Sequence, residues 1–318
     1  MFKKQNNRML DEKGGPGHAE HYRNRTNVKQ TGRMIMRTVS KRYMLAFAAA
    51  ALVLFAFSSV QAASFTKDLS AGKVKVHYPS PAPAACEAIL LGVGTAMSRE
   101  GYDNLASAIS AYGYVVVIMD HAPGNMIKTD ATKFRNLALA VRANLVGWLA
   151  GSGCSSISHW LMGGHSAGGQ AAQNAVSSDP TLADAVFSID PYNCSSTGNV
   201  VVPAMYWGFD VTTCFVTKED AAEAAYYGSM GQRAFYRVDR VYSWGWCGYS
   251  PKYFHCSFAD NHCPACTNCW YTPGYFFSDV ARSVNKFINA AFYGTWSKSA
   301  LSMSSSTPLD LFVDGDQP

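Results

Sequence analysis

The sequence predicts an α/β fold with a mostly parallel central sheet and helices on both of its faces. Two observations lead to this prediction. Runs of β-branched and other apolar residues recur along the chain without polar interruption, which is typical of strands buried on both faces. Helical stretches separate these runs, and strands that alternate with helices form parallel sheets.

The expected elements follow one another from residue 88 to residue 292. Strands are expected at 88–92, 114–120, 159–163, 184–190, 201–207 and, as the last of the series, 234–240. Helices are expected at 102–112, at 133–150, in the small-residue run after Ser166, and at 278–292. Sheets of this kind carry their sites at the carboxyl ends of the strands. The residues that follow each strand are therefore the candidates for a functional site.

A leader is expected before this series. Met44–Phe57 holds 14 residues without a charge or a strong polar group. This run is short for a membrane span of about 20 residues and right for the apolar core of a secretory signal. Arg37, Lys41 and Arg42 supply a basic flank, and we place cleavage after Ala62. An uncleaved signal anchor is the alternative.

The chain is accordingly divided into a leader at 1–62, one domain at 63–296 and a serine-rich tail at 297–318 that is expected to be unstructured. The polar stretch before Met34 is expected to be disordered, or Met34 or Met36 is the true start. The chain has 27 basic and 22 acidic residues, and the leader holds 11 of the basic and 3 of the acidic ones. The rest of the chain therefore has 16 basic and 19 acidic residues, a formal net charge of −3. Nothing in this charge favours a nucleic-acid partner.

All nine cysteines lie after the leader. Secretion favours disulfides, and the odd number leaves one cysteine free or in an intermolecular bond. Asn193, Cys194 and Ser195 form a glycosylation sequon. Cysteines and aromatic residues are dense between Tyr242 and Phe277, which predicts either an apolar wall for a substrate or simple packing of a stapled loop.

The segment LMGGHSAGGQAAQ predicts a sharp turn at Ser166. Gly164, Ser166 and Gly168 match the glycine-x-serine-x-glycine pattern, and they stand between an expected strand and an expected helix. In such an elbow the serine has a strained backbone and an exposed hydroxyl, and neighbouring side chains would collide there. We therefore expect Ser166 to be a nucleophile.

A nucleophilic serine needs a histidine to take its proton and a carboxylate to orient that histidine. In the elbow fold these follow later in the chain, in the order serine, acid, histidine. Asp190 ends the strand after the elbow and Asp210 ends the next one, so both qualify by position. A helix cap or a turn is the structural alternative for each aspartate.

Three segments resemble chlorophyllases and related bacterial enzymes of the α/β-hydrolase superfamily. FSIDPYN resembles their aspartate–proline segment, and FHCSFAD resembles the histidine segment of the bacterial relatives. The stretch from Ala88 to His121 is similar to their oxyanion strand and the helix and strand after it, and the resemblance covers about Lys73 to Gly294. It implies the α/β-hydrolase fold, Asp190 as the acid and His255 as the base.

The sequence also departs from this family. Val93 and Gly94 stand where many relatives have histidine–glycine, and Ala167 stands where chlorophyllases usually have a charged residue. About a dozen additional residues, VYSWGWCGYSPKY, precede His255. Because of these departures, the resemblance does not by itself identify chlorophyll as the substrate.

The same superfamily implies two backbone donors for an oxyanion. One is the amide of Ala167, directly after the nucleophile. The other belongs to the loop GVGTAMS, where alignment places it at Thr95, with Ala96 as the neighbouring alternative.

His262 is an alternative base, because a histidine beside a cysteine in a short loop also occurs in secreted polyester hydrolases. Together with His255 and four cysteines, Cys256, Cys263, Cys266 and Cys269, it also forms an alternative zinc site, although secretion favours disulfides there. His121, His159 and His165 are expected to be hydrogen-bonded structural residues.

The expected function is that of a secreted serine hydrolase that cleaves carboxylic esters through an acyl-enzyme, without a cofactor or metal. The expected partner is a small-molecule or lipid ester, with no nucleic acid and no stable membrane span after signal cleavage. The alternatives are an interfacial lipase or cutinase-like polyester hydrolase, and a non-catalytic binding protein with the hydrolase fold.

Overall fold

A nine-stranded sheet forms the centre of the described part of the chain. The computed structural model describes residues 61–120, 130–192, 200–210, 221–239, 242–245, 248–251, 253–260 and 274–314. All of them belong to the second of the chain's two units, Ser59–Pro318. Residues 1–60 of the leader and the Asn193 sequon lie outside the described residues, and nothing in the structure tests cleavage after Ala62, so these expectations remain predictions.

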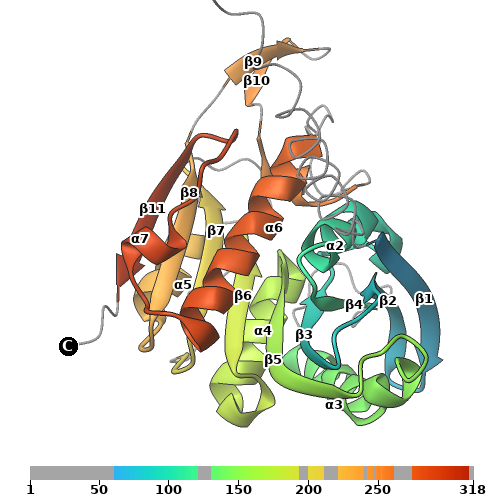
Figure 1. Cartoon of the computed structure of the whole chain (residues 1–318). Coiled ribbons are helices and arrows are strands. Elements are labelled where there is room, and N and C mark those ends of the chain that lie inside the picture. Colours follow the sequence, from blue (N-terminus) through green and yellow to red (C-terminus); the bar gives the residue numbers. More distant parts are fainter. Residues whose placement is uncertain are drawn as a thin grey trace, which may run out of the picture. The chain divides into compact units, whose positions relative to one another are not determined.

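The order of the strands across the sheet is β1-β2-β4-β3-β5-β6-β7-β8-β11. Neighbouring strands from β4 to β8 are parallel, whereas β1, β2 and β11 are antiparallel to their neighbours. Figure 1 shows β1 and β11 at opposite edges. The strands are β1 (Gln61–Leu69), β2 (Gly72–Ser80), β3 (Ala85–Gly92), β4 (Val115–Asp120), β5 (Ser156–His165), β6 (Ala185–Ile189), β7 (Ala204–Phe209), β8 (Arg233–Val238) and β11 (Leu309–Asp314).

The α/β class and the mostly parallel sheet are thus confirmed, and every expected strand is present. The sequence did not predict β1, β2 and β11, nor the separate hairpin of β9 (Tyr242–Gly245) and β10 (Gly248–Pro251), which lies within the additional segment before His255. β1 begins at Gln61, so the ordered sheet reaches two residues into the expected leader, and Gln61 pairs with Ser80.

Helices cover both faces of the sheet. The main helices are α2 (Asp103–Ser110), α3 (Ala131–Trp148), α4 (Ala167–Ser178), α5 (Ala221–Gly228), α6 (Gly274–Ile288) and α7 (Lys298–Leu301). Residues of α2 and α6 share one apolar cluster, and residues of α3, α4 and α5 share the other. Figure 1 shows α6 in front of the sheet and beside α2.

The side chains of β4 show why its sequence lacks polar interruptions. Val116 and Ile118 point into the cluster of α2 and α6, whereas Val117 and Met119 point into the opposite cluster. All four are fully buried. Burial on both faces removes the need for a polar side at any position of the strand.

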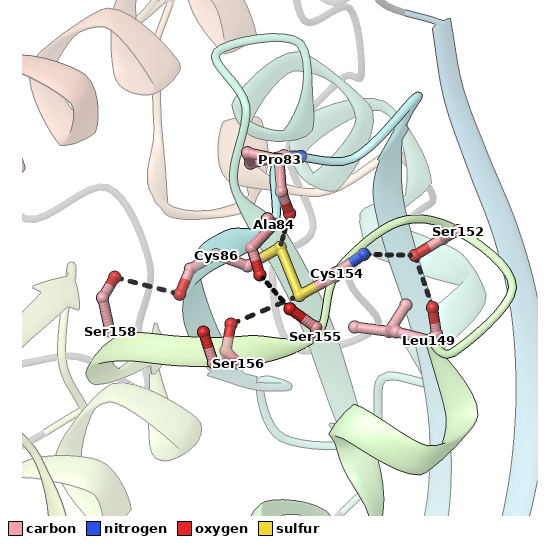
Figure 2. Close-up of a disulfide and its surroundings, with 9 residues drawn as sticks. All are labelled: Pro83, Ala84, Cys86, Leu149, Ser152, Cys154, Ser155, Ser156 and Ser158. Carbon is pink, nitrogen blue, oxygen red and sulfur yellow. Dashed lines mark hydrogen bonds between the residues drawn. A yellow bond between two sulfur atoms is a disulfide. The ribbon is translucent and has the colours of Figure 1, made fainter.

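A disulfide joins the amino ends of two neighbouring strands. Cys86 in β3 and Cys154, just before β5, are bonded, with their Cα atoms 6.0 Å apart (Figure 2). Beside the disulfide, the carbonyl of Ala84 accepts hydrogen bonds from the Ser155 amide at 2.9 Å and from its hydroxyl at 3.0 Å. The link therefore holds β3 and β5 together at the end opposite their carboxyl termini.

The expectation of an unstructured tail is wrong for residues 297–314. This segment forms α7 and β11, and β11 pairs with β8. Buried Asp279 of α6 anchors the connection, since its Oδ2 accepts bonds from the Ser306 amide and from both the amide and the hydroxyl of Thr307. Leu301 is fully buried as well. These contacts supply the burial that the serine-rich composition does not indicate.

In the parts of the chain that the structure describes, no helix combines the length and the hydropathy needed to span a bilayer.

We expect Gly168→Ala to destabilise the protein and Gly147→Ala to leave it equally or more stable. A Cβ at Gly168, in α4, would lie 2.3 Å from the carbonyl carbon and oxygen of Gly92. Such overpacking costs about 1–3 kcal/mol. Gly147, in α3, has no such neighbour within 4 Å, and alanine there favours the helix by up to about 1 kcal/mol. Urea unfolding of both variants measures the difference, and equal losses of stability would contradict this account.

Candidate functional site

Ser166 lies at the turn between β5 and α4. Its backbone has φ 54° and ψ −121°, which is strained for a residue with a side chain. The turn is held by hydrogen bonds on both sides: the Ser166 amide donates to the Ile189 carbonyl at 2.9 Å, and the Ser166 carbonyl accepts from the Tyr192 amide at 3.2 Å. Hydrogen bonds therefore connect the backbone of Ser166 to β6 and to the residues that follow β6.

Glycines make this turn sterically possible. A Cβ on Gly164 would lie 2.6 Å from the Gly92 oxygen and 2.6 Å from the carbonyl carbon of Gly168. A Cβ on Gly169 would lie 2.4 Å from the Ser188 hydroxyl oxygen. The expectation that side chains would collide around Ser166 is confirmed. Close approach of the first turn of α4 to β3 and β5 is what requires glycine at these positions.

Asp190 and His255 form a buried pair near the elbow. The Nδ1–H of His255 donates to Oδ2 of Asp190 at 2.6 Å. Asp190 follows β6, and His255 opens the short helix η3 (His255–Phe258) beyond the β9–β10 hairpin. Their exposed fractions are 7% and 1%. This bond leaves Nε2 as the His255 nitrogen that can accept a proton.

Asp210 occupies a different strand end. It directly follows β7, and its amide donates to the Val238 carbonyl of β8 at 3.1 Å. Of the two aspartates considered as the acid, the structure therefore brings Asp190 to His255. His262 lies outside the described residues.

The loop expected to hold the oxyanion contacts the elbow. It begins after β3 with a tight turn in which the Met97 amide donates to the Gly94 carbonyl at 3.2 Å, and Ala96 has φ 57°. A Cβ built on Gly94 would lie 3.4 Å from the Cβ of Ser166. Thr95 is thus next to a glycine that leaves no more than the space of one methyl group beside the serine.

The two expected oxyanion amides have different origins. Ala167 is the first residue of α4, and an amide at that position has no acceptor within its own helix. In the loop, the Gly94 amide donates to the Tyr102 hydroxyl at 2.8 Å. The candidates in the turn are therefore Thr95 and its neighbour Ala96.

Backbone strain marks the same strand ends. Among the described residues, the non-glycine residues with positive φ are Ala96, Ser166 and Asp190. They follow β3, β5 and β6, which are adjacent in the sheet. Strained residues of this kind persist where the surrounding structure holds them, and they cluster at functional sites.

Tyr102 and His165, the residue directly before Ser166, form a second buried polar pair. The His165 Nδ1 lies 2.8 Å from the Tyr102 hydroxyl, and its Nε2 lies 2.8 Å from the His255 carbonyl oxygen. Both side chains are fully buried. Burial, followed by the proximity of His255, lowers the pKa of His165 well below its ordinary value. His165 is a hydrogen-bonded structural residue, as expected. Tyr102 belongs to the helix start that resembles the family, but nothing local in the sequence predicts its bond to His165.

Asp260 attaches the segment of His255 to the helix that follows the loop of Thr95. Its amide donates to the Gly101 carbonyl at 2.7 Å, and its Oδ2 accepts from the Asn104 amide at 2.7 Å. Its Oδ1 is buried with no hydrogen-bond partner in the described structure. Burial, together with the charge of Asp103, raises the pKa of Asp260 to about 6.

The possible zinc site falls mostly outside the described residues, because 261–273 include His262 and the three cysteines that follow it. Within the described ranges, no group of three or more histidine, cysteine or acidic side chains could hold a metal ion.

We expect Asp260→Asn to change how stability depends on pH. The folded protein binds a proton at Asp260 more tightly than the unfolded chain does, because the pKa rises from 3.8 to about 6. The stabilising contribution of the protonated carboxyl is therefore complete below pH 4 and is lost as the pH rises through 6. Asparagine keeps an acceptor for the Asn104 amide without a charge.

The free energy of unfolding of wild type, relative to Asp260→Asn, should consequently fall between pH 4 and pH 7. Asp184→Asn is the control, since Asp184 is an exposed carboxylate that also accepts from a backbone amide, that of Trp160. If the free energies of unfolding of wild type and Asp260→Asn change with pH in parallel, this effect is ruled out.

The sequence matches no protein-family model and no curated protein. The arrangement of Ser166, Asp190 and His255 is therefore the main indication of an activity.

Proposed function

We propose that this protein is a secreted serine hydrolase of the α/β-hydrolase fold that cleaves carboxylic esters. The observation that carries the proposal is the 2.6 Å hydrogen bond between His255 and Asp190 beside a strained serine at a strand-to-helix turn. The three residues also follow the chain order serine, acid, histidine of α/β-hydrolases. The parallel sheet with helices on both faces is compatible with that fold.

In this proposal the Oγ of Ser166 attacks the ester carbonyl while Nε2 of His255 takes the hydroxyl proton. The carbonyl oxygen becomes an oxyanion, which accepts hydrogen bonds from the amides of Ala167 and Thr95. When the tetrahedral intermediate collapses, the C–O bond to the alcohol breaks and His255 returns the proton to the leaving oxygen. Water then attacks the acyl-enzyme by the same route and releases the acid and Ser166.

Asp190 has two roles in these steps. It holds the proton of His255 on Nδ1, so that Nε2 is the nitrogen that faces the chemistry as a base. It also stabilises the imidazolium that forms after proton transfer. A buried carboxylate is costly without partners, and this hydrogen bond offsets part of that cost.

A fluorophosphonate probe should label wild-type protein at Ser166, and p-nitrophenyl esters should be hydrolysed. Ser166→Ala should lose labelling and at least about 10⁴-fold in kcat, because the nucleophile is absent. Ser178→Ala is the matched control, since Ser178 lies at the other end of α4 and its hydroxyl donates to the Asn174 carbonyl. It should keep both properties.

Folded wild-type protein without labelling or turnover would contradict the proposal and favour a binding protein of the same fold. Substrates of increasing acyl length, together with a polyester film, separate the remaining alternatives. A rate that rises sharply when the substrate forms micelles or films would identify an interfacial lipase or polyester hydrolase.

Two pairs of variants test the acid and the base. Asp190→Asn and His255→Ala should each lower kcat by about 10⁴-fold, because the tautomer or the proton acceptor is lost. Asp210→Asn and His262→Ala should keep most of the activity. Circular dichroism confirms folding in each case. Folded, inactive His262→Ala beside active His255→Ala would move the base to His262, and the same exchange between the aspartates would move the acid to Asp210.

A further inference from the structure

A buried tyrosine and histidine connect the separate loops of the candidate site. We infer that Tyr102 and His165 are positioning residues, which hold the oxyanion loop and the backbone of His255 in register with Ser166. This inference rests on the proposed function and extends it to residues that do not touch the substrate. Tyr102 ends η1 (Arg99–Tyr102), and His165 ends β5 directly before Ser166.

The direction of each hydrogen bond follows from the chemistry of the groups. The carbonyl of His255 can only accept, so Nε2 of His165 carries the hydrogen in their 2.8 Å bond. His165 is neutral because its pKa is well below the ordinary value, and its Nδ1 is therefore an acceptor. The Tyr102 hydroxyl must then donate to Nδ1, at 2.8 Å.

The chain of bonds ends in the oxyanion loop. The Gly94 amide donates to the oxygen of Tyr102 at 2.8 Å, so this hydroxyl both accepts and donates. The sulfur of Met97 also lies 3.6 Å from the hydroxyl, but it is the weaker acceptor for the single proton. One continuous path thus runs from Gly94 through Tyr102 and His165 to His255.

Close packing makes this path rigid. A Cβ on Gly94 would lie 3.0 Å from the Tyr102 oxygen and 3.1 Å from the His165 Nδ1, so glycine is what allows the loop to approach both groups. The ring centroids of His165 and His255 are 4.4 Å apart. Buried polar groups in such a network hold one geometry, because any other leaves donors or acceptors unpaired.

The neutral state of His165 matters for the proposed reaction. His255 becomes positively charged when it takes the proton of Ser166, and a second cation 4.4 Å away would oppose that step. Nε2 of His165 must carry a hydrogen, because it donates to the carbonyl of His255. Nδ1 of His165 accepts the hydrogen of the Tyr102 hydroxyl and therefore carries none of its own. The pair therefore holds His165 as an uncharged donor beside the base.

Tyr102→Phe tests the inference, with Tyr236→Phe as the matched control. Both variants remove one buried hydroxyl and keep the ring, and the Tyr236 hydroxyl donates to the Leu301 carbonyl at 2.7 Å. We expect Tyr102→Phe to lower kcat on a p-nitrophenyl ester by about 10- to 100-fold with KM within about twofold, because a small misplacement of the reacting groups is costly. Tyr236→Phe should change neither constant by more than about twofold.

Histidine NMR supplies a readout that needs no turnover. In isotopically labelled wild-type protein, His165 should be the neutral tautomer with its hydrogen on Nε2 across pH 5–9. The downfield resonance of the His255 Nδ1–H, which is bonded to Asp190, should shift in Tyr102→Phe and stay unchanged in Tyr236→Phe.

The outcomes separate this inference from the proposed function. A folded Tyr102→Phe with wild-type kcat, or a protonated His165, would overturn the positioning role and leave the hydrolase proposal in place. Wild-type protein without ester hydrolysis but with the expected tautomer and resonance shift would overturn the function, while the link from Tyr102 to His255 would stand. If Tyr236→Phe lowered kcat as much as Tyr102→Phe, loss of any buried hydroxyl would explain both results. That outcome would contradict the inference.

Discussion

The first turn of α4 approaches β3 and β5 so closely that backbone meets backbone at Gly92, Gly164 and Gly168. This contact forces the chain to leave β5 and enter a helix within one residue. Ser166 stands at that position, and its backbone is strained there, with φ 54°. The surrounding packing over-determines the turn, so the strained conformation persists in the folded state. The loop after β3 and the opening of α4 meet at the same place.

Burial governs the electrostatics of the same region. His255, Asp190 and His165 are almost completely removed from solvent, and each polar contact among them is stronger there than it would be in water. An ionised or unpaired group is correspondingly costly. Burial lowers the pKa of His165 well below its ordinary value, so His165 stays neutral beside the hydrogen-bonded Asp190–His255 pair. A proton transferred from Ser166 would thus have one acceptor with a carboxylate behind it.

Elements far from the site hold its parts in place. The disulfide between Cys86 and Cys154 joins β3 and β5 at their amino ends, whereas their carboxyl ends carry the loop of Thr95 and the elbow. β11 covers the outer edge of β8, the last strand of the central sheet before the segment of His255. Asp260 then fastens that segment to the amino end of α2. The sheet transmits these constraints because its strands are hydrogen-bonded neighbours.

Local chemistry allowed the sequence by itself to determine the α/β class, the positions of the parallel strands and the glycine-flanked turn at Ser166. Apolar runs and glycine spacing act over a few residues, so they can be interpreted without a fold. Position along the chain left Asp190 and Asp210 both open, and only a resemblance favoured Asp190; the contact of Asp190 with His255, 65 positions away, comes from the tertiary structure. The tertiary structure also decided that the serine-rich tail adds β11 and that Tyr102 reaches His165, 63 positions away. Such contacts depend on how the strands are ordered across the sheet, and no short segment encodes that order.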